Sequence, residues 1–280
     1  MYVNSKTATA ALLLATSTAF AKDGAVHPHR IPYEALSADP LHTENRSILI
    51  ESLSKDGLVS VTGIPGFGKT KRDLMTHLHA CMMDQGDDVP QQIFQDGTVR
   101  RTLATVTLPG AGAQPLASVS ESAAESESCQ SFNKHLDSFR ASVDKATVAF
   151  ADRLSFEMGS SLPTPLMSTK DGSQDFHDIK EVVASGEHLE HFHSYQKSNN
   201  KADDRDDQKE TIGLHADQGF FISFSPGLLV SHKENQTPDL SQPLVVSEGF
   251  YVENSDGHRS LLQFDAEDDL VFMMGDGVNQ

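Results

Sequence analysis

The chain has 280 residues, and 38% of them are hydrophobic, which is enough apolar side chain for a buried core. Its 40 acidic residues outnumber 22 basic ones, and the formal net charge is −18. Because so acidic a chain repels phosphate backbones and anionic lipid surfaces, we expect neither nucleic acid nor a membrane among its partners. No apolar run approaches the roughly 20 residues of a membrane span.

The first 21 residues have the composition of a secretory signal peptide. Lys6 precedes an apolar stretch, residues 8–21, whose last three residues form the small-x-small cleavage site Ala19-Phe20-Ala21. We therefore expect a signal peptide over 1–21, a mature chain that starts near Lys22, and secretion. The alternative is a mobile hydrophobic N-terminus.

The chain contains two cysteines, Cys81 and Cys129. In an oxidising compartment they could pair. Cys81 falls in a helix-like run, however, where a buried free thiol is an equal alternative. The sequence leaves the pairing open.

Helical periodicity dominates the first 160 residues. Residues 22–43 are rich in His, Pro and Asp and are expected to be an extended lead-in. Apolar spacing predicts helices over 45–57, 71–83 and 132–159. Short runs rich in β-branched residues predict strands over 58–62 and 98–110. A Ser- and Glu-rich segment, 117–131, is expected to be a flexible loop or the start of the last helix.

Short alternating runs replace the helical pattern from about residue 180. They predict strands over 187–196, 211–215, 219–225, 228–231, 249–253, 259–264 and 269–276. The sequence NSDG at 254–257 predicts a hairpin turn. The acidic segment 201–210 is expected at the solvated tip of a long hairpin. Several short strands at this spacing are typical of a barrel or sandwich, so the order of elements indicates an α+β fold.

Residues Gly63–Thr70, GIPGFGKT, satisfy the phosphate-loop pattern between an apolar strand and a helix. A phosphate-loop NTPase also requires alternating βα units and a carboxylate after a nearby strand. This chain has a helical half followed by a strand-rich half, and Phe67 is bulky for such a loop. We therefore expect no nucleotide binding here, and a phosphate-loop protein remains the less favoured alternative.

The segment LHADQGFFISF carries the strongest chemical signal. His215 and Asp217 lie two residues apart at the end of an expected strand, where both side chains can reach one cation. Imidazole with carboxylate suits Fe(II), as two corners of a facial triad whose third ligand is a distant histidine.

In these segments the chain resembles the 2-oxoglutarate- and Fe(II)-dependent oxygenases of the isopenicillin N synthase-like family. That family has a strand with a Tyr, then His-x-Asp-x-Gly, a strand, a hairpin and an apolar strand ending in Gly-Asp. The chain shows HFHSYQ, HADQG, FFISFSPGLLV, GFYVENSDGHRSLLQF and DLVFMMGDGVNQ in that order. Near the N-terminus, GIPG is similar to the family's turn after its first strand.

The resemblance implies an α+β fold with a double-stranded β-helix, or jelly-roll-like, core. That core would occupy 161–280, incomplete at its C-terminus, after an N-terminal helical α/β region over 22–160. The implied function is that of a dioxygenase-like oxidoreductase that oxidises a small organic molecule, with 2-oxoglutarate as co-substrate. His215 and Asp217 would hold Fe(II), and Tyr195 matches the family's co-substrate-binding Tyr.

In the family, a distal His and a 2-oxoglutarate-binding Arg follow the Gly-Asp strand, whereas this chain stops at Gln280. We therefore expect impaired activity, unless a histidine of the strand 187–196 replaces the missing ligand. His191 and His193 are the candidates, with His188 nearby, and ordinary polar surface is the alternative for them. The rival class is a secreted, non-catalytic binding or interaction protein with a decayed site and open sheet edges that a protein partner could cover.

Overall fold

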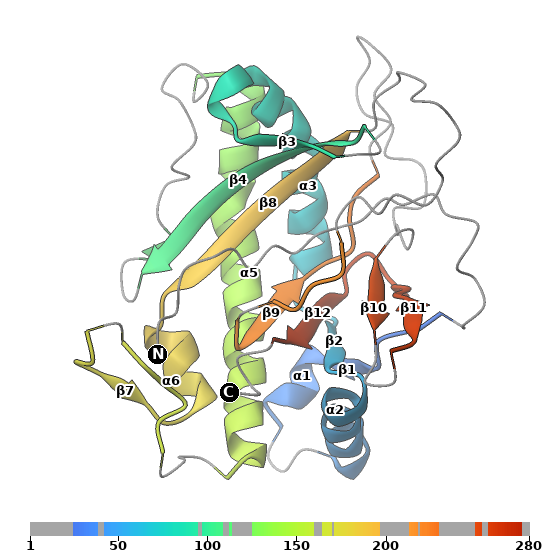
Figure 1. The fold of residues 1–280 in the computed structure, drawn as a ribbon, viewed down its shortest axis with the longest axis vertical. Coiled ribbons are helices and arrows are strands. Elements are labelled where there is room, and N and C mark those ends of the chain that lie inside the picture. Colours follow the sequence, from blue (N-terminus) through green and yellow to red (C-terminus); the bar gives the residue numbers. More distant parts are fainter. Residues whose placement is uncertain are drawn as a thin grey trace.

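The computed structural model describes residues 25–38, 42–94, 97–108, 112–113, 125–159, 164–169, 171–196, 213–217, 219–229, 250–253 and 257–275. The expected signal peptide and the acidic segment 201–210 lie outside these residues. The described part is a mixed α and β fold with helices and several sheets (Figure 1).

The fold contains two long helices, α3 (Phe67–Asp84) and α5 (Glu127–Glu157), and several shorter ones. The shorter helices are α1 (Tyr33–Leu36), α2 (Thr43–Lys55) and α6 (Ile179–Ser185), with a 3-10 turn η1 (Gly86–Asp88). Helix α5 begins inside the Ser- and Glu-rich segment, because the Ser126 side chain accepts a hydrogen bond from the backbone N–H of Cys129 and caps it. This confirms the expected start of a helix there.

The strands form two four-stranded sheets and two hairpins. They are β1 (Arg30–Pro32), β2 (Leu58–Thr62), β3 (Gln91–Ile93), β4 (Val99–Leu108), β5 (Gly112–Ala113), β6 (Met167–Ser168), β7 (Asp175–Phe176), β8 (His188–Gln196), β9 (Phe221–Phe224), β10 (Tyr251–Glu253), β11 (Arg259–Leu261) and β12 (Leu270–Met274). One sheet has the order β1-β2-β12-β9, with β1 parallel to β2 and the other neighbours antiparallel. In the other, β4 pairs with β3, β5 and, over nearly its whole length, β8.

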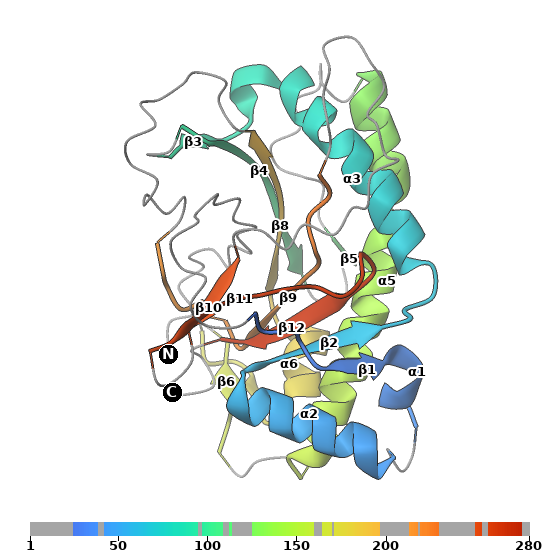
Figure 2. The same cartoon turned by 90° about the vertical axis from the view of Figure 1, so that its right-hand side faces the viewer.

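Helix α5 runs along one side of the molecule, and both sheets pack against it (Figure 2). Phe150 contacts the rings of Phe221 on β9 and Phe272 on β12, with ring centroids 5.5 and 4.2 Å away, and those two rings also contact each other. Higher on the same helix, Phe132 and Phe139 contact Phe192 of β8 at 5.5 and 5.9 Å. The two sheets therefore share one hydrophobic core along α5.

The opposite face of the β2-β12-β9 sheet buries a second, smaller cluster. Its buried members are Leu58, Ile222, Phe224, Leu262, Phe264 and Val271. The hairpin β10–β11 contributes to this cluster, with Tyr251 paired to Leu261 in register. The expected hairpin around NSDG is thus confirmed, although residues 254–256 lie outside the described residues.

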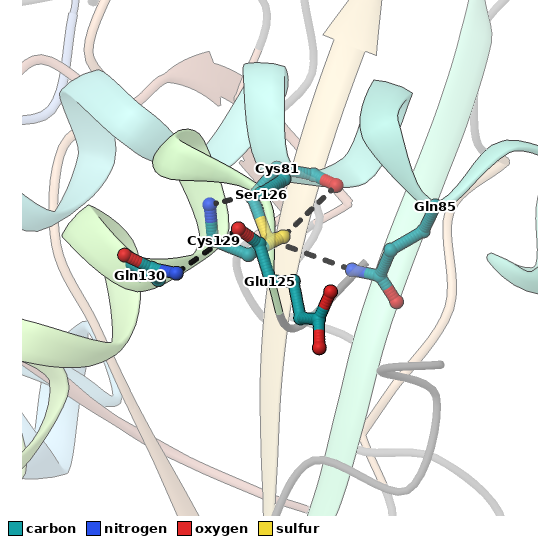
Figure 3. The surroundings of a disulfide bond; sticks show 6 residues. All are labelled: Cys81, Gln85, Glu125, Ser126, Cys129 and Gln130. Carbon is teal, nitrogen blue, oxygen red and sulfur yellow. Dashed lines mark hydrogen bonds between the residues drawn. A yellow bond between two sulfur atoms is a disulfide. The ribbon is translucent and has the colours of Figure 1, made fainter. Parts of the chain in front are cut away.

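A disulfide joins Cys81 of α3 to Cys129 of α5 (Figure 3). Both half-cystines are fully buried, and the Gln85 amide lies 3.6 Å from the Cys81 sulfur. The amide of Gln130 donates to the Glu125 carbonyl beside the start of α5. The pairing that the sequence left open is therefore formed in the structure, where it ties the two long helices together.

Three sequence expectations need correction. The lead-in 22–43 contains β1 and α1, which the sequence did not predict because a three-residue parallel edge strand ending at Pro32 has too few residues to show a period. The described part of the expected strand 211–215 is not a strand, since His215 bonds back to Gly213 in a local turn. Leu228 and Leu229, expected in a strand, are also irregular.

Candidate functional site

His215 and Asp217 lie on the segment that leads into β9, beside the end of β12. The Gly275 N–H donates to the Phe220 carbonyl, which fixes this segment against the sheet. A Cβ on Gly275 would lie 2.1 Å from the Gly219 carbonyl oxygen and 2.9 Å from that of Asp217. Only glycine fits at this close approach, so the end of β12 positions the His-x-Asp segment.

The ring of His215 is oriented by its own backbone. Its Nδ1 lies 2.9 Å from the Gly213 carbonyl oxygen, which can only accept, so Nδ1 carries the proton and donates. In the neutral ring Nε2 then has a free lone pair, and it lies 3.5 Å from Oδ1 of Asp217. The imidazole is partly exposed, so a solute can reach this gap.

Asp217 presents a buried carboxylate. Its side chain is only 7% exposed, against 44% for that of His215. Burial raises the pKa of the Asp217 carboxyl above its ordinary value, and the His215 ring opposes that shift only in its protonated, cationic form. A cation at this position would replace the lost solvation.

The structure does not join a third ligand to this pair within the residues it describes. No group of three or more His, Cys, Asp or Glu side chains suited to a metal occurs among them. His191 and His193 therefore do not complete a cluster with His215 and Asp217 in this arrangement.

Strand β8 separates its side chains onto two faces. Glu190 pairs with Arg140 of α5, Phe192 packs on the α5 rings, and Ser194 bonds the ring of His79 on α3. The intervening residues His191, His193 and Tyr195 therefore point away from these helices. Neighbouring rings in this row lie 5.5 and 6.1 Å apart between centroids, so the row is continuous.

His193 is held in a fixed, uncharged state. Its Nδ1 lies 3.0 Å from the hydroxyl of Thr102, the residue opposite it on β4. Burial lowers the pKa of His193 to about 3, and Arg100 and His191 add to the effect. At neutral pH this side chain is an imidazole that offers Nε2 to the sheet face.

Arg100 belongs to the same face, although no motif in the sequence indicated a role for it. It lies opposite Tyr195 in register and donates to the Gln92 side chain at 2.8 Å. Its guanidinium also stacks over the Phe94 ring, 5.4 Å from the centroid. The one signal in the sequence was the pair Arg100-Arg101, since one of two adjacent strand residues must point to each face.

The segment GIPGFGKT has a packing explanation. Gly63 and Gly66 adopt positive φ in the turn between β2 and α3, and Phe67 is buried against Phe139. Lys69 turns outward to Asp73, while the Thr70 hydroxyl donates to the Gly66 carbonyl.

The next residues of α3 dock on the turn before β12. A Cβ on Gly68 would come within 2.9 Å of Cβ of Asp268, so the glycine of Gly-Lys-Thr allows this approach. Lys71 is buried and donates to the Glu267 carbonyl, and Arg72 pairs with the Glu267 carboxylate. The polar groups of this loop are thus engaged within the chain.

Within the described residues, none of the helices is both long and apolar enough to cross a membrane.

The fold is similar to that of solved structures of Neurospora crassa T7H. Full-length T7H in complex with alpha-KG and 5-formyluracil matches with a TM-score of 0.55 and 13% sequence identity, over 91% of this chain and 73% of that chain. C-terminally truncated T7H in apo form matches with a TM-score of 0.51 and 13% identity, over 91% and 84% of the two chains. At this identity the likeness shows the fold alone.

No protein-family model matches the chain. No curated protein matches it either.

Proposed function

We propose that this protein is an Fe(II)- and 2-oxoglutarate-dependent, oxygenase-like protein that oxidises a small organic molecule. His215 and Asp217 are two of the metal's ligands. The coarse support is a fold shared with a protein solved with alpha-KG, which is 2-oxoglutarate. The same likeness supports a finer proposal, that the two sheets along α5 belong to one double-stranded β-helix.

The observation that carries the proposal is a pair of acceptor atoms that face each other. Nε2 of His215 has a lone pair because Nδ1 donates to Gly213, and it lies 3.5 Å from the Asp217 carboxylate. Two ligand atoms bound to one ion at about 2.1 Å each lie roughly 3 to 3.5 Å apart. Two facing acceptors are stabilised by a cation between them, and this donor set suits Fe(II).

When bound, Fe(II) supplies open coordination positions and the redox chemistry that dioxygen requires. The chain's own residues do the positioning. The Gly213 carbonyl orients the imidazole, as carbonyl partners do for metal-ligating histidines. The contact of Gly275 with the Asp217 backbone holds the carboxylate at the end of the sheet.

Calorimetry with Mn(II) tests the ligand assignment. His215→Ala and Asp217→Ala should each weaken Mn(II) binding by at least about tenfold, and binding should weaken at acidic pH because His215 must be neutral to ligate. His27→Ala is the matched control, since His27 forms another His–Asp pair with Asp265 at 2.7 Å. Equal binding by wild type and His215→Ala would remove the proposed site.

A 2-oxoglutarate consumption assay then separates enzyme from binding protein. Turnover that His215→Ala abolishes would support the oxygenase. Metal binding without turnover would favour the rival, a non-catalytic binding protein. Loss of metal binding in His191→Ala or His193→Ala would identify the third ligand.

We also propose that the chain is secreted. The composition of residues 1–21 supports this, as does the Cys81–Cys129 disulfide, since disulfides persist mainly in oxidising compartments. N-terminal sequencing of protein recovered from the medium should begin near Lys22. A mature chain that starts at Met1 would contradict it.

A further inference from the structure

We propose that Arg100 and His193 form a binding site for the carboxylate of a small organic acid. The site lies on the face of the β4–β8 pair that points away from α3 and α5. This proposal goes beyond the metal site and does not depend on it.

The two side chains are diagonal neighbours on one face. Arg100 lies opposite Tyr195, and Thr102 lies opposite His193, so Arg100 and His193 are two positions apart across the strands. Side chains at this offset on an antiparallel pair are within reach of each other when they are long. Because Glu190 faces α5 and pairs with Arg140, His193 lies on the opposite face of β8.

Both side chains have a buried nitrogen that no hydrogen bond satisfies. They are Nε of Arg100 and Nε2 of His193. A buried N–H without an acceptor is energetically costly, so such atoms are uncommon and often mark a bound water, ion or ligand. Two such nitrogens on diagonal positions of one sheet face indicate a shared acceptor.

The remaining contacts restrain both groups. Gln92 and the Phe94 ring hold the guanidinium of Arg100, whose Nε is buried without a hydrogen-bond partner. In the tautomer that we propose, the Thr102 hydroxyl donates to Nδ1 of His193, so Nε2 carries the proton and is a second donor.

Charge decides which acceptor fits. Arg100 is always cationic, and among the described residues no acidic side chain forms an ion pair with it. A carboxylate supplies the missing negative charge and two acceptor oxygens, the geometry that a guanidinium recognises best. Water supplies acceptor atoms without the charge.

The test uses metal-free wild-type protein in EDTA, so that failure of the metal site cannot affect it. Succinate, phenylacetate and 2-oxoglutarate are titrated by calorimetry, with succinamide and phenylacetamide as uncharged counterparts. At least one acid should bind and its amide should not. Arg100→Gln should weaken that binding by at least about tenfold. The control Arg101→Gln, with the same charge change on the adjacent strand position, should alter it less than about twofold.

The substitution His193→Phe provides a second, independent variant. His193→Phe removes Nε2, keeps a ring of similar size, and should weaken the same acid by at least about threefold. Thermal unfolding of each variant checks that it folds.

Titration of the acid that binds, with and without saturating 2-oxoglutarate, distinguishes the source of the carboxylate. Mutual exclusion assigns the site to the co-substrate acid, and simultaneous binding assigns it to a substrate acid. The proposal is overturned if no acid binds the wild type, if acids and amides bind alike, or if Arg100→Gln and His193→Phe both bind as wild type does.

Discussion

Lys71 shows how burial determines the chemistry of a single side chain. Its ammonium is buried where α3 meets the turn before β12, and it donates to the Glu267 carbonyl. Burial lowers the pKa of Lys71 to about 8 from a model-compound value of 10.5, although nearby Glu267, Asp268 and Asp269 oppose the shift. Below about pH 8 the folded protein therefore carries a buried charge that the unfolded chain keeps in water.

The pH dependence of Lys71→Met follows from this. Between about pH 8 and 10.5 the unfolded chain binds more protons at Lys71 than the folded chain, so wild-type stability rises with pH. The free energy of unfolding of the wild type relative to Lys71→Met should rise by about 1 to 2 kcal/mol from about pH 7.5 to 9.5. Urea unfolding at both pH values measures it, with the exposed Lys69→Met as control. A difference that is independent of pH would contradict the prediction.

Gly275→Ala tests the close approach that positions Asp217. The added methyl would overlap the Gly219 carbonyl oxygen, so the backbone must shift. We expect a loss of about 1 to 3 kcal/mol in stability, with weaker Mn(II) binding in the same variant. Gly219→Ala is the matched control, because its Cβ would meet its nearest atom at 3.5 Å, an ordinary contact. Equal effects from both substitutions would argue against this role of Gly275.

At the scale of elements, α3 and α5 act as one layer because the disulfide and aromatic contacts join them. Cys81 and Cys129 are 48 positions apart in the chain, and residues from both β-sheets pack against α5. The sequence predicted both helices from apolar spacing. It did not predict the pairing, because two cysteines in separate elements carry no information on whether those elements meet.

Removal of the disulfide should destabilise the protein without changing its fold. Closing a loop of this length restricts the unfolded chain, and the double variant Cys81→Ala/Cys129→Ala should lose about 2 to 4 kcal/mol of unfolding free energy. Urea unfolding of the variant, and of the wild type with and without reductant, measures this. Reduced wild type should resemble the variant, and an unchanged midpoint in both would show that the cross-link contributes nothing.

At the scale of the whole molecule, local patterns predicted elements and missed their assembly. Apolar spacing anticipated α2, α3 and α5, and β-branched or alternating runs anticipated β2, β4, β8 and β12, all within a few residues. The sequence shows a helical half followed by a strand-rich half. From this order we did not predict that β2, in the first half, lies between β1 and β12 in one sheet. Sheet order is a long-range property that residue periodicity does not encode.

The candidate sites show the same division. The spacing of His215 and Asp217 was visible in the sequence, whereas the carbonyl of Gly213 and the contact with Gly275 depend on the folded backbone. Arg100 acquires its significance only from its position across the strands from Tyr195 and diagonal to His193. Its role depends on register, which a single sequence does not give.

The central position of β12 has a consequence for synthesis on the ribosome. This strand comes late in the chain, at 270–274, yet it joins β2 to β9, whose residues emerge far earlier. Until it emerges, β2 and β9 have no bridge between them, and Phe150 lacks its stacking partner Phe272. Nascent chains that lack β12 should therefore remain incompletely folded, with exposed apolar surface that chaperones bind. Ribosome-stalled chains that end at residue 268 should be digested by protease much faster than chains extended with a linker beyond 275, and equal resistance would show that the sheet closes without β12.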